Sequence, residues 1–258
     1  MAITLKSRRE IELMRKAGAV VASVLSKLQE IAEPGVSTGE LNRIALDMSA
    51  DAGAEPLFKG VRNPAAKAPF SGAVCTSVNE QVVHGIPSDK VKLKSGDILS
   101  IDFGVRLNGY CGDAAITIGI GEVLQERCKL MEVTKEALEI IIAKAAPAVK
   151  WSRIAAEIQS CVESAGFSVV KDFVGHGIGR RMHEEPKVPN FVSDELLADD
   201  IILTEGMVLA VEPMVNAGSS GVRTLKDGWT VITRDGKCSA HFEHTIVIVK
   251  NGCEVLTI

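Results

Sequence analysis

Apolar residues near the start of the chain recur at helical spacing. Ser7 and Glu10 have the spacing of a capping box, which opens a helix. The run ends at Pro34-Gly35, and its apolar positions are Ile11, Met14, Val21, Val24, Leu25 and Leu28. The same signal at Ser37-Thr-Gly-Glu40 predicts a second helix that ends by Gly53.

The pattern then changes from helical spacing to short β-rich runs. Residues 54–72 contain several prolines and glycines without a period, so we expect a long loop there. Strands are predicted at 73–78, 81–84, 98–105 and 111–120. Asn108-Gly109, between the last two, is typical of a two-residue hairpin turn.

A second α-rich stretch, from about 122 to 165, is interrupted at Pro147. Its expected apolar face is made of Leu124, Cys128, Met131, Leu138 and Ala145. Strands with turn signals then continue to the end of the chain. The order of helices, strands, helices, strands predicts an α+β fold of two similar halves.

A short internal repeat supports the duplication. Gly96-Asp-Ile-Leu-Ser-Ile-Asp102 and Gly206-Met-Val-Leu-Ala-Val-Glu212 both have a glycine, an apolar strand and a carboxylate at matching positions. Chance similarity between two β-strands is the alternative. We expect one domain over residues 1–258, with halves of approximately 1–121 and 122–258.

Composition narrows the classes of protein. The chain has 258 residues, of which 46% are hydrophobic, enough for a large core. A net charge of -4, without basic clusters, argues against nucleic-acid binding. No secretory signal and no apolar run of about 18 residues is seen. The six cysteines have neither metal-binding nor disulfide spacing, so we expect free thiols in a soluble, cytoplasmic protein.

Two aspartates lie on the expected hairpin. If Asn108-Gly109 forms the turn, Asp102 faces Ala115, and Asp113 is its diagonal neighbour on the same face. Their Cα atoms would then be ~7–8 Å apart. Two like charges so placed either share a cation or point to water.

Further carboxylates interrupt apolar strands. Glu212 follows the strand beginning at Met207, and Glu243 precedes a run of β-branched residues. Such carboxylates need a counter-charge or strong hydrogen bonds. Of the five histidines, His84, His176 and His183 lie in motifs with glycine or proline nearby. Each alone would more often be structural, but four carboxylates and a histidine suit two divalent ions and hydrolytic chemistry.

Other motifs are excluded. The segment from His183 lacks the second histidine of His-Glu-x-x-His, and neither a Rossmann nor a phosphate-binding glycine loop is complete. A glycosidase would leave two carboxylates unexplained.

The ordered motifs resemble type I methionine aminopeptidase of peptidase family M24 over essentially the whole chain. They are Val-His84-Gly-Ile-Pro, Ile-Asp102, Gly-Asp113, Gly-His176-Gly-Ile-Gly, His183-Glu-Glu-Pro, Val-Glu212-Pro and Phe-Glu243-His-Thr. The resemblance implies the pita-bread fold, in which two pseudo-twofold-related α+β halves place a curved antiparallel sheet around a dinuclear metal site. The stretch between His183 and Glu212 is too short for the insertion typical of type II enzymes.

By resemblance, Asp113 and Glu243 bridge two ions (Co²⁺, Mn²⁺, Fe²⁺ or Zn²⁺), Asp102 binds one, and His176 with Glu212 binds the other. A metal-bridging water or hydroxide would attack the first peptide carbonyl, with Glu212 as proton shuttle. His84 and His183 resemble the histidines that contact substrate and stabilise the tetrahedral intermediate.

The methionine pocket is where this chain departs from the family. By position, Phe70, Cys75, Met182 and Trp229 resemble its lining, with core packing as the alternative for Phe70 and Met182. The loop Asn63–Phe70 lacks the tyrosines common there. Cysteine at 111 also stands where histidine is frequent.

The resemblance implies an enzyme that removes initiator methionine from nascent proteins, preferring a small second residue. We expect a monomer that contacts the ribosome transiently and binds neither nucleic acid specifically nor membranes. The alternatives are another pita-bread exopeptidase, of the Xaa-Pro type, and a non-catalytic peptide-binding module.

Overall fold

The computed structural model describes residues 3–258, which form five helices and fifteen strands. The helices are α1 (Arg8–Ile31), α2 (Thr38–Asp51), α3 (Gln125–Lys144), α4 (Trp151–Ser164) and α5 (Asp194–Ala198). The strands of the first half are β1 (Glu55–Pro56), β2 (Cys75–Val78), β3 (Gln81–Val83), β4 (Ile98–Leu107) and β5 (Tyr110–Gly119). Those that follow are β6 (Ser168–Val169), β7 (Gly175–Gly177), β8 (Glu184–Val188), β9 (Val208–Val211), β10 (Met214–Asn216), β11 (Val222–Thr224), β12 (Val231–Thr233), β13 (Ser239–His241), β14 (His244–Val249) and β15 (Gly252–Val255).

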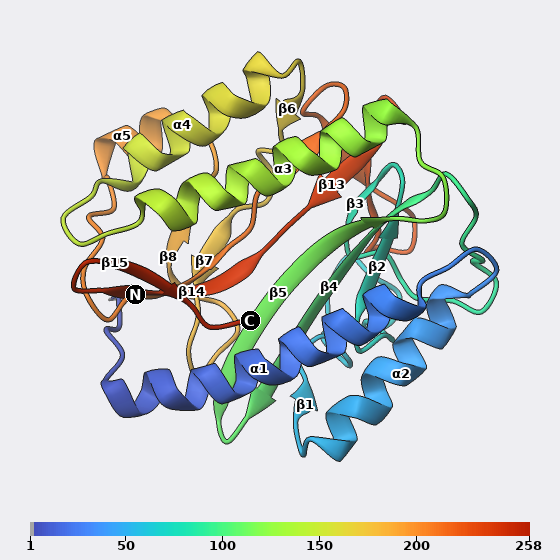
Figure 1. Ribbon diagram of the computed structural model, residues 1–258, viewed down its shortest axis with the longest axis horizontal. Helices are drawn as coiled ribbons and strands as arrows, with labels where there is room; N and C mark the ends of the chain where they lie inside the picture. Colours follow the sequence, from blue (N-terminus) through green and yellow to red (C-terminus); the bar gives the residue numbers. More distant parts are fainter. Residues whose placement is uncertain (1–2) are drawn as a thin grey trace.

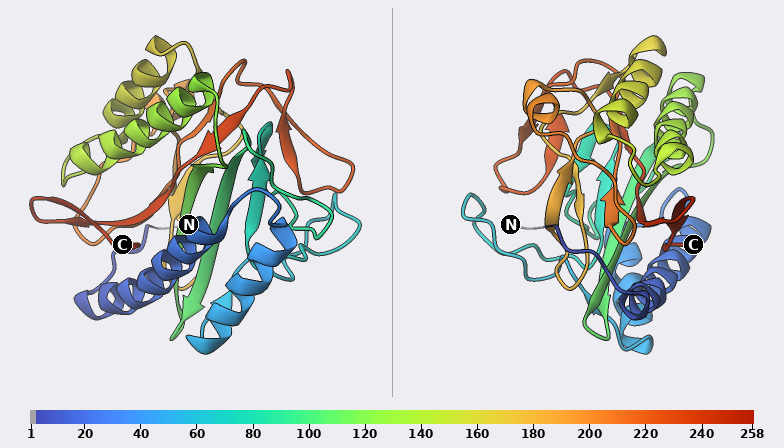
Figure 2. Two further views of the ribbon diagram at one scale, coloured as in Figure 1. Left: turned by 45° about the vertical axis from the view of Figure 1, so that its right-hand side comes forward. Right: turned by 90° about the vertical axis from the view of Figure 1, so that its left-hand side faces the viewer.

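Two helical pairs cover the strands (Figure 1). One core cluster joins α1 and α2 to β4 and β5, and another joins α3 and α4 to β9 and β14. Figure 2 shows α1 and α3 on the same side of the strands. The opposite side of the central strands is thereby left for a site.

The strand pairings are all antiparallel. One sheet has the order β1-β4-β2 with β5 on β4, and the largest has the order β15-β14-β9-β7-β8. An isolated bridge between Ala115 and Glu243 joins the two. Strands of both halves therefore meet where the predicted ligands lie.

The internal repeat has the same backbone geometry in both copies. Gly96 and Gly206 have φ angles of 97° and 90°, a region that favours glycine. Their N–H groups donate to the carbonyls of Ile120 and Ile248 at 2.8 and 2.9 Å. The two copies therefore share the backbone conformation and the hydrogen bonding of their first residue.

The first two helices are confirmed. The Ser7 hydroxyl and the Glu10 carboxylate cap each other's backbone N–H groups, and the Ser37 hydroxyl accepts from the Glu40 N–H at 3.2 Å. The expected loop at 54–72 is wrong in its first residues, because Glu55–Pro56 pair with Arg106 and Val105 of β4.

The predicted apolar face of the second α-rich stretch is confirmed at Leu138 and Ala145, which are buried, and differs at its other three positions. Leu124 is the N-cap of α3 and is 69% exposed. Cys128 and Met131 are only half-buried, since they line a surface hollow that they share with Gln29 of α1. The face that packs inward is made of Leu130, Val133, Thr134, Ala137, Leu138 and Ile141.

No helix among residues 3–258 combines the length and the apolar character needed to cross a lipid bilayer.

Candidate metal centre and substrate pocket

The β4–β5 hairpin places two aspartates as its turn predicts. Leu107 pairs with Tyr110, Asp102 faces Ala115, and Asp113 faces Gly104. Asp102 and Asp113 are therefore diagonal neighbours on one face of the hairpin. The prediction from the Asn108-Gly109 turn is confirmed.

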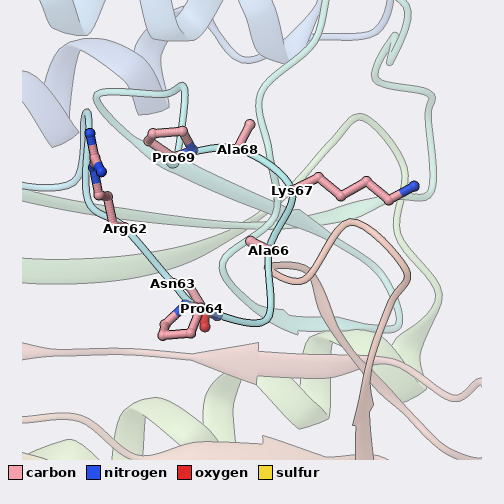
Figure 3. Close-up of a pocket in the computed structure, with 7 residues that line it drawn as sticks. All are labelled: Arg62, Asn63, Pro64, Ala66, Lys67, Ala68 and Pro69. Atoms are coloured by element: carbon pink, nitrogen blue, oxygen red, sulfur yellow. The ribbon is translucent and has the colours of Figure 1, made fainter.

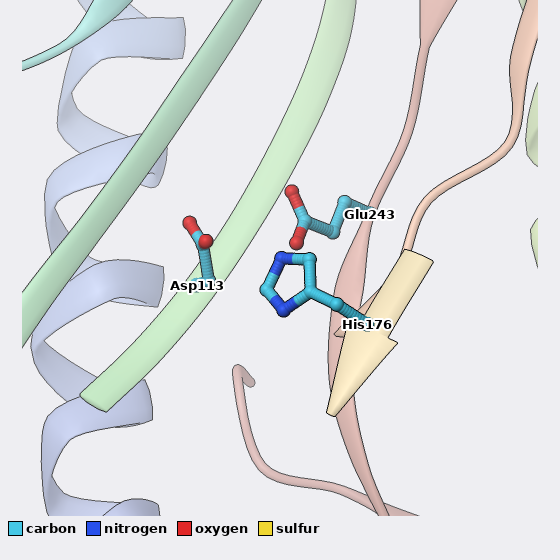
Figure 4. A group of neighbouring side chains, drawn as sticks. All are labelled: Asp113, His176 and Glu243. Carbon is cyan, nitrogen blue, oxygen red and sulfur yellow. The ribbon is translucent and has the colours of Figure 1, made fainter. Parts of the chain in front are cut away.

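The second half contributes the remaining carboxylates and a histidine. Glu243 exchanges backbone hydrogen bonds with Ala115, at 2.9 and 3.3 Å, which brings its side chain beside β5. His176 of β7 pairs with Ala210 of β9, whose strand leads into Glu212. One potential ligand atom from each of Asp113, His176 and Glu243 lies within 4.8 Å of the others (Figure 4).

The His176 ring is oriented toward Glu212. Its Nδ1 lies 2.9 Å from the Gly177 carbonyl, and its Nε2 lies 3.5 Å from Glu212 Oε1. When Nδ1 carries the proton and donates to that carbonyl, Nε2 presents a lone pair to the carboxylates. This is the arrangement of a metal-binding histidine with a backbone partner.

The centre contains buried oxygens that need a cation. Among the residues that the structure describes, Asp102 Oδ1, Asp113 Oδ1 and Glu243 Oε1 are buried and have no hydrogen-bond partner. Unpaired buried carboxylate oxygens are unfavourable, and divalent ions are the usual partners of such oxygen-rich sets. The four carboxylates and His176 therefore fit divalent metal binding.

The pKa values of these side chains, in the protein without metal, also indicate a site that needs cations. Burial raises the pKa of Asp113 to about 7. Burial, followed by repulsion from neighbouring carboxylates, also holds the pKa values of Asp102, Glu212 and Glu243 well above their ordinary range. Burial lowers the pKa of His176 to about 4, so this imidazole is neutral and able to bind a metal at pH 7.

An apolar cavity of about 190 Å³ opens beside the carboxylates. Asp102, His84 and His183 lie at its polar end. Its apolar lining includes the four residues expected from the sequence together with two others: Phe58, Val61, Phe70, Cys75, Met182 and Trp229. The cavity has the size and polarity for one apolar side chain beside a reacting bond.

The strand register explains why this cavity adjoins the carboxylates. Cys75 of β2 pairs directly with Asp102 of β4. The rings of Phe70 and Trp229 meet edge to face, with centroids 5.3 Å apart. Both aromatic residues therefore serve the cavity and not only the general core.

The atypical loop lies against a turn of the second half. Asn63 Nδ2 donates to the Gly228 carbonyl and Trp229 Nε1 donates to the Ala68 carbonyl, both at 2.9 Å. The outer part of this loop surrounds a second, open hollow (Figure 3). These hydrogen bonds connect the loop to the turn that carries Trp229, which lines the apolar cavity.

The two predicted substrate-contacting histidines flank the cavity. His84 is half-buried in a left-handed backbone conformation, with φ 58°. Burial, and then the charge of His183, lower its pKa to about 4. His183 is exposed, and its ring centroid lies 4.4 Å from that of His176.

Sequence reasoning missed three residues of the site. Phe58 and Val61 belong to a loop without periodicity, which gave no signal for them. His241 is buried, and its Nε2 lies 3.9 Å from carboxylate oxygens of both Glu212 and Glu243. Its position two residues before Glu243 was the available signal, because alternate residues of a strand share a face.

Comparison with known proteins agrees with this geometry. The profile of metallopeptidase family M24 matches residues 12–250. A methionine aminopeptidase of Clostridium perfringens is 50% identical over 99% of both chains. The crystal structure of a methionine aminopeptidase from Thermotoga maritima matches with a TM-score of 0.93 and 41% identity, covering 99% of each chain.

A more distant structure shows how widely the fold is shared. Prolidase from Pyrococcus furiosus matches 98% of this chain and 65% of its own, with a TM-score of 0.72 at 22% identity. This likeness concerns the fold alone.

Proposed function

The chain belongs to metallopeptidase family M24 and within it to the methionine aminopeptidases, with the pita-bread fold, and we propose that it releases initiator methionine by hydrolysing the first peptide bond of nascent proteins. The observation that carries the proposal is the apolar cavity of about 190 Å³ beside buried carboxylates that need cations. We propose a preference for a small second residue.

We further propose that two divalent ions are held by five side chains. The side chains that would hold them are Asp102, Asp113, His176, Glu212 and Glu243. The convergence of both halves on this point supports the assignment. When bound, such a pair activates a water molecule and polarises the substrate carbonyl. Co²⁺, Mn²⁺, Fe²⁺ and Zn²⁺ are the candidates.

The protein side chains then have distinct tasks. The cavity residues Phe70, Cys75, Met182 and Trp229 would hold the methionine side chain. Glu212 would take a proton from the attacking water and pass it to the leaving nitrogen. His84 and His183 would donate hydrogen bonds to the developing oxyanion. The low pKa of His84, which leaves its ring neutral, supports a hydrogen-bonding rather than a charged role.

We also propose the domain organisation, the oligomeric state and the location of the enzyme. We propose one catalytic domain over residues 1–258, with halves of about 1–121 and 122–258. It would act as a cytoplasmic monomer on nascent N-termini, with transient contact to the ribosome and no specific nucleic-acid binding.

The test is a peptide assay with metal-loaded protein. Methionine should be released from a Met-Ala-Ser peptide with at least one of the four metals, and Asp113→Asn should abolish release. Cleavage of Xaa-Pro peptides instead would favour the other exopeptidase class. Absence of cleavage with every metal, together with no bound metal, would favour a peptide-binding module. Metal analysis should find two ions per chain.

A further inference from the structure

Lys6 is a buried lysine that comes just before α1. Its side chain is 5% exposed, and its Nζ lies 2.7 Å from Glu184 Oε2. The same ammonium donates to the Thr4 carbonyl at 3.2 Å. A buried ion pair is unfavourable unless its geometry and its other hydrogen bonds are good. Both hydrogen bonds of the Lys6 ammonium are therefore needed to offset its burial, and one of them joins segments far apart in the sequence.

Glu184 is the partner that connects Lys6 to the site. It is the first residue of β8 and directly follows His183. Its second oxygen accepts from the Arg181 N–H at 3.1 Å. Lys6 thus holds a carboxylate that itself closes the turn carrying Met182 and His183.

A glycine leaves the space for this ion pair. A Cβ on Gly179 would lie 2.4 Å from Lys6 Cε and 2.8 Å from both carboxylate oxygens of Glu184. Contacts this close require one of the groups to shift. The last glycine of Gly175-His-Gly-Ile-Gly179 therefore leaves the space that the ion pair occupies.

Neighbouring contacts hold the same turn. The Gly179 carbonyl accepts from the Cys111 N–H at 2.8 Å, and the Arg180 guanidinium lies 4.7 Å from the centre of the Tyr110 ring. The Tyr110 hydroxyl donates to Glu10 Oε1 at 2.9 Å. Segments 6–10 and 110–111 therefore fix the turn from two sides.

His183 directly follows this turn, so the contacts of the turn set the position of its backbone. Asp113 is buried and His176 has a backbone partner, whereas the ring of the exposed His183 meets that of His176 edge to face. A displacement of about 1 Å in a catalytic group can lower activity about 100-fold. We infer that Lys6 and Glu184 are a positioning pair that holds His183 at the scissile bond, an inference that rests on the proposed function.

The experiment compares Lys6→Met with the parent protein, both metal-loaded and well below their unfolding temperatures. Lys6→Met keeps an unbranched side chain of similar length and removes its charge. We expect kcat for a Met-Ala-Ser peptide to fall about 10-fold to 100-fold, while KM changes less and metal content stays the same. Lys6→Arg should restore most of the loss, because a cation again reaches Glu184.

A double-mutant cycle separates positioning from general destabilisation. In a His183→Ala background, Lys6→Met should lower kcat little further, since the group that it positions is gone. If Lys6→Met does not fold, Glu184→Gln takes its place in the cycle, and the same small further loss of kcat is expected in the His183→Ala background. Arg15→Met is the matched control: it removes an exposed ion pair of α1 with Glu254 and should leave kcat unchanged.

Equal kcat values for Lys6→Met and the parent, or additive losses with His183→Ala, would overturn the inference. Failure of the proposed function looks different, because the parent protein itself would then release no methionine.

Discussion

Gly104 lies directly opposite Asp113 across the β4–β5 hairpin, and a Cβ on Gly104 would lie 2.8 Å from Asp113 Oδ1. The glycine therefore leaves the space into which a central carboxylate of the metal site extends.

Gly104→Ala should weaken metal binding by at least about 10-fold, because the Asp113 carboxylate must rotate away from the methyl group. The measurement is metal titration by calorimetry, with the free energy of unfolding from urea denaturation alongside. Gly109→Ala, at the turn of the same hairpin, meets no neighbouring atom and serves as control. It strains a backbone with φ 80° and should lower stability without changing metal affinity.

The stability that Asp113 contributes to the metal-free protein should fall as pH rises from about 4 to about 7. Burial raises the pKa of Asp113 in the folded protein to about 7, above its ordinary value of 3.8. Its contribution to stability is therefore present at low pH and is lost as pH rises through about 7. The measurement is the difference in the free energy of unfolding between the parent and Asp113→Asn, from urea denaturation with a chelator at several pH values. The difference is needed because histidines whose pKa values are lowered by burial change the stability of both proteins in the opposite direction. A parent stability that rises relative to that of Asp113→Asn over this range would contradict the proposed protonation of the centre.

Metal should reverse that trend. At a free metal concentration of 100 times Kd, binding stabilises the protein by about 2.7 kcal/mol, or roughly 5–10 °C in Tm. Differential scanning fluorimetry with and without metal measures the shift. Asp113→Asn should remove most of it, whereas a variant of an exposed carboxylate such as Glu30→Gln should keep it.

Metal affinity should fall as pH decreases below about 7. The ions need ionised carboxylates, and the pKa of Asp113 is about 7, whereas that of His176 is already lowered to about 4. Carboxylate protonation, not imidazole protonation, should thus limit binding between pH 5 and 7. Calorimetry in buffers of different ionisation enthalpy should detect protons released on binding. Affinity independent of pH down to about 5 would contradict the prediction.

Phe70→Ala should lower kcat/KM for methionine peptides by about 10-fold to 200-fold, mainly through KM. The substitution opens the apolar cavity and removes the edge contact with Trp229. Phe167→Ala is a control of equal size in the core of the other half. It should reduce stability comparably and leave KM unchanged. Equal KM values for Phe70→Ala and the parent would remove Phe70 from the pocket.

Much of this protein follows from its sequence because the signals involved are local. The Ser7 and Glu10 capping box sets the start of α1. Counting through Asn108-Gly109 gives the relative placement of Asp102 and Asp113, because register in a tight hairpin depends only on its turn. The two glycine-led strands also match in the structure at their first residue, with φ 97° at Gly96 and 90° at Gly206.

Other features needed the folded chain because their partners are distant in sequence. Pattern alone made no connection between Lys6 and Glu184, and gave Phe58 no place in a pocket. His241 gained its relation to Glu212 only when β10 and β13 were paired. Which face of α3 is buried was likewise decided by packing against α4 and the sheet. Local hydrogen bonds and turn geometry were thus readable from the sequence, while the convergence of two halves on one buried centre depended on tertiary packing.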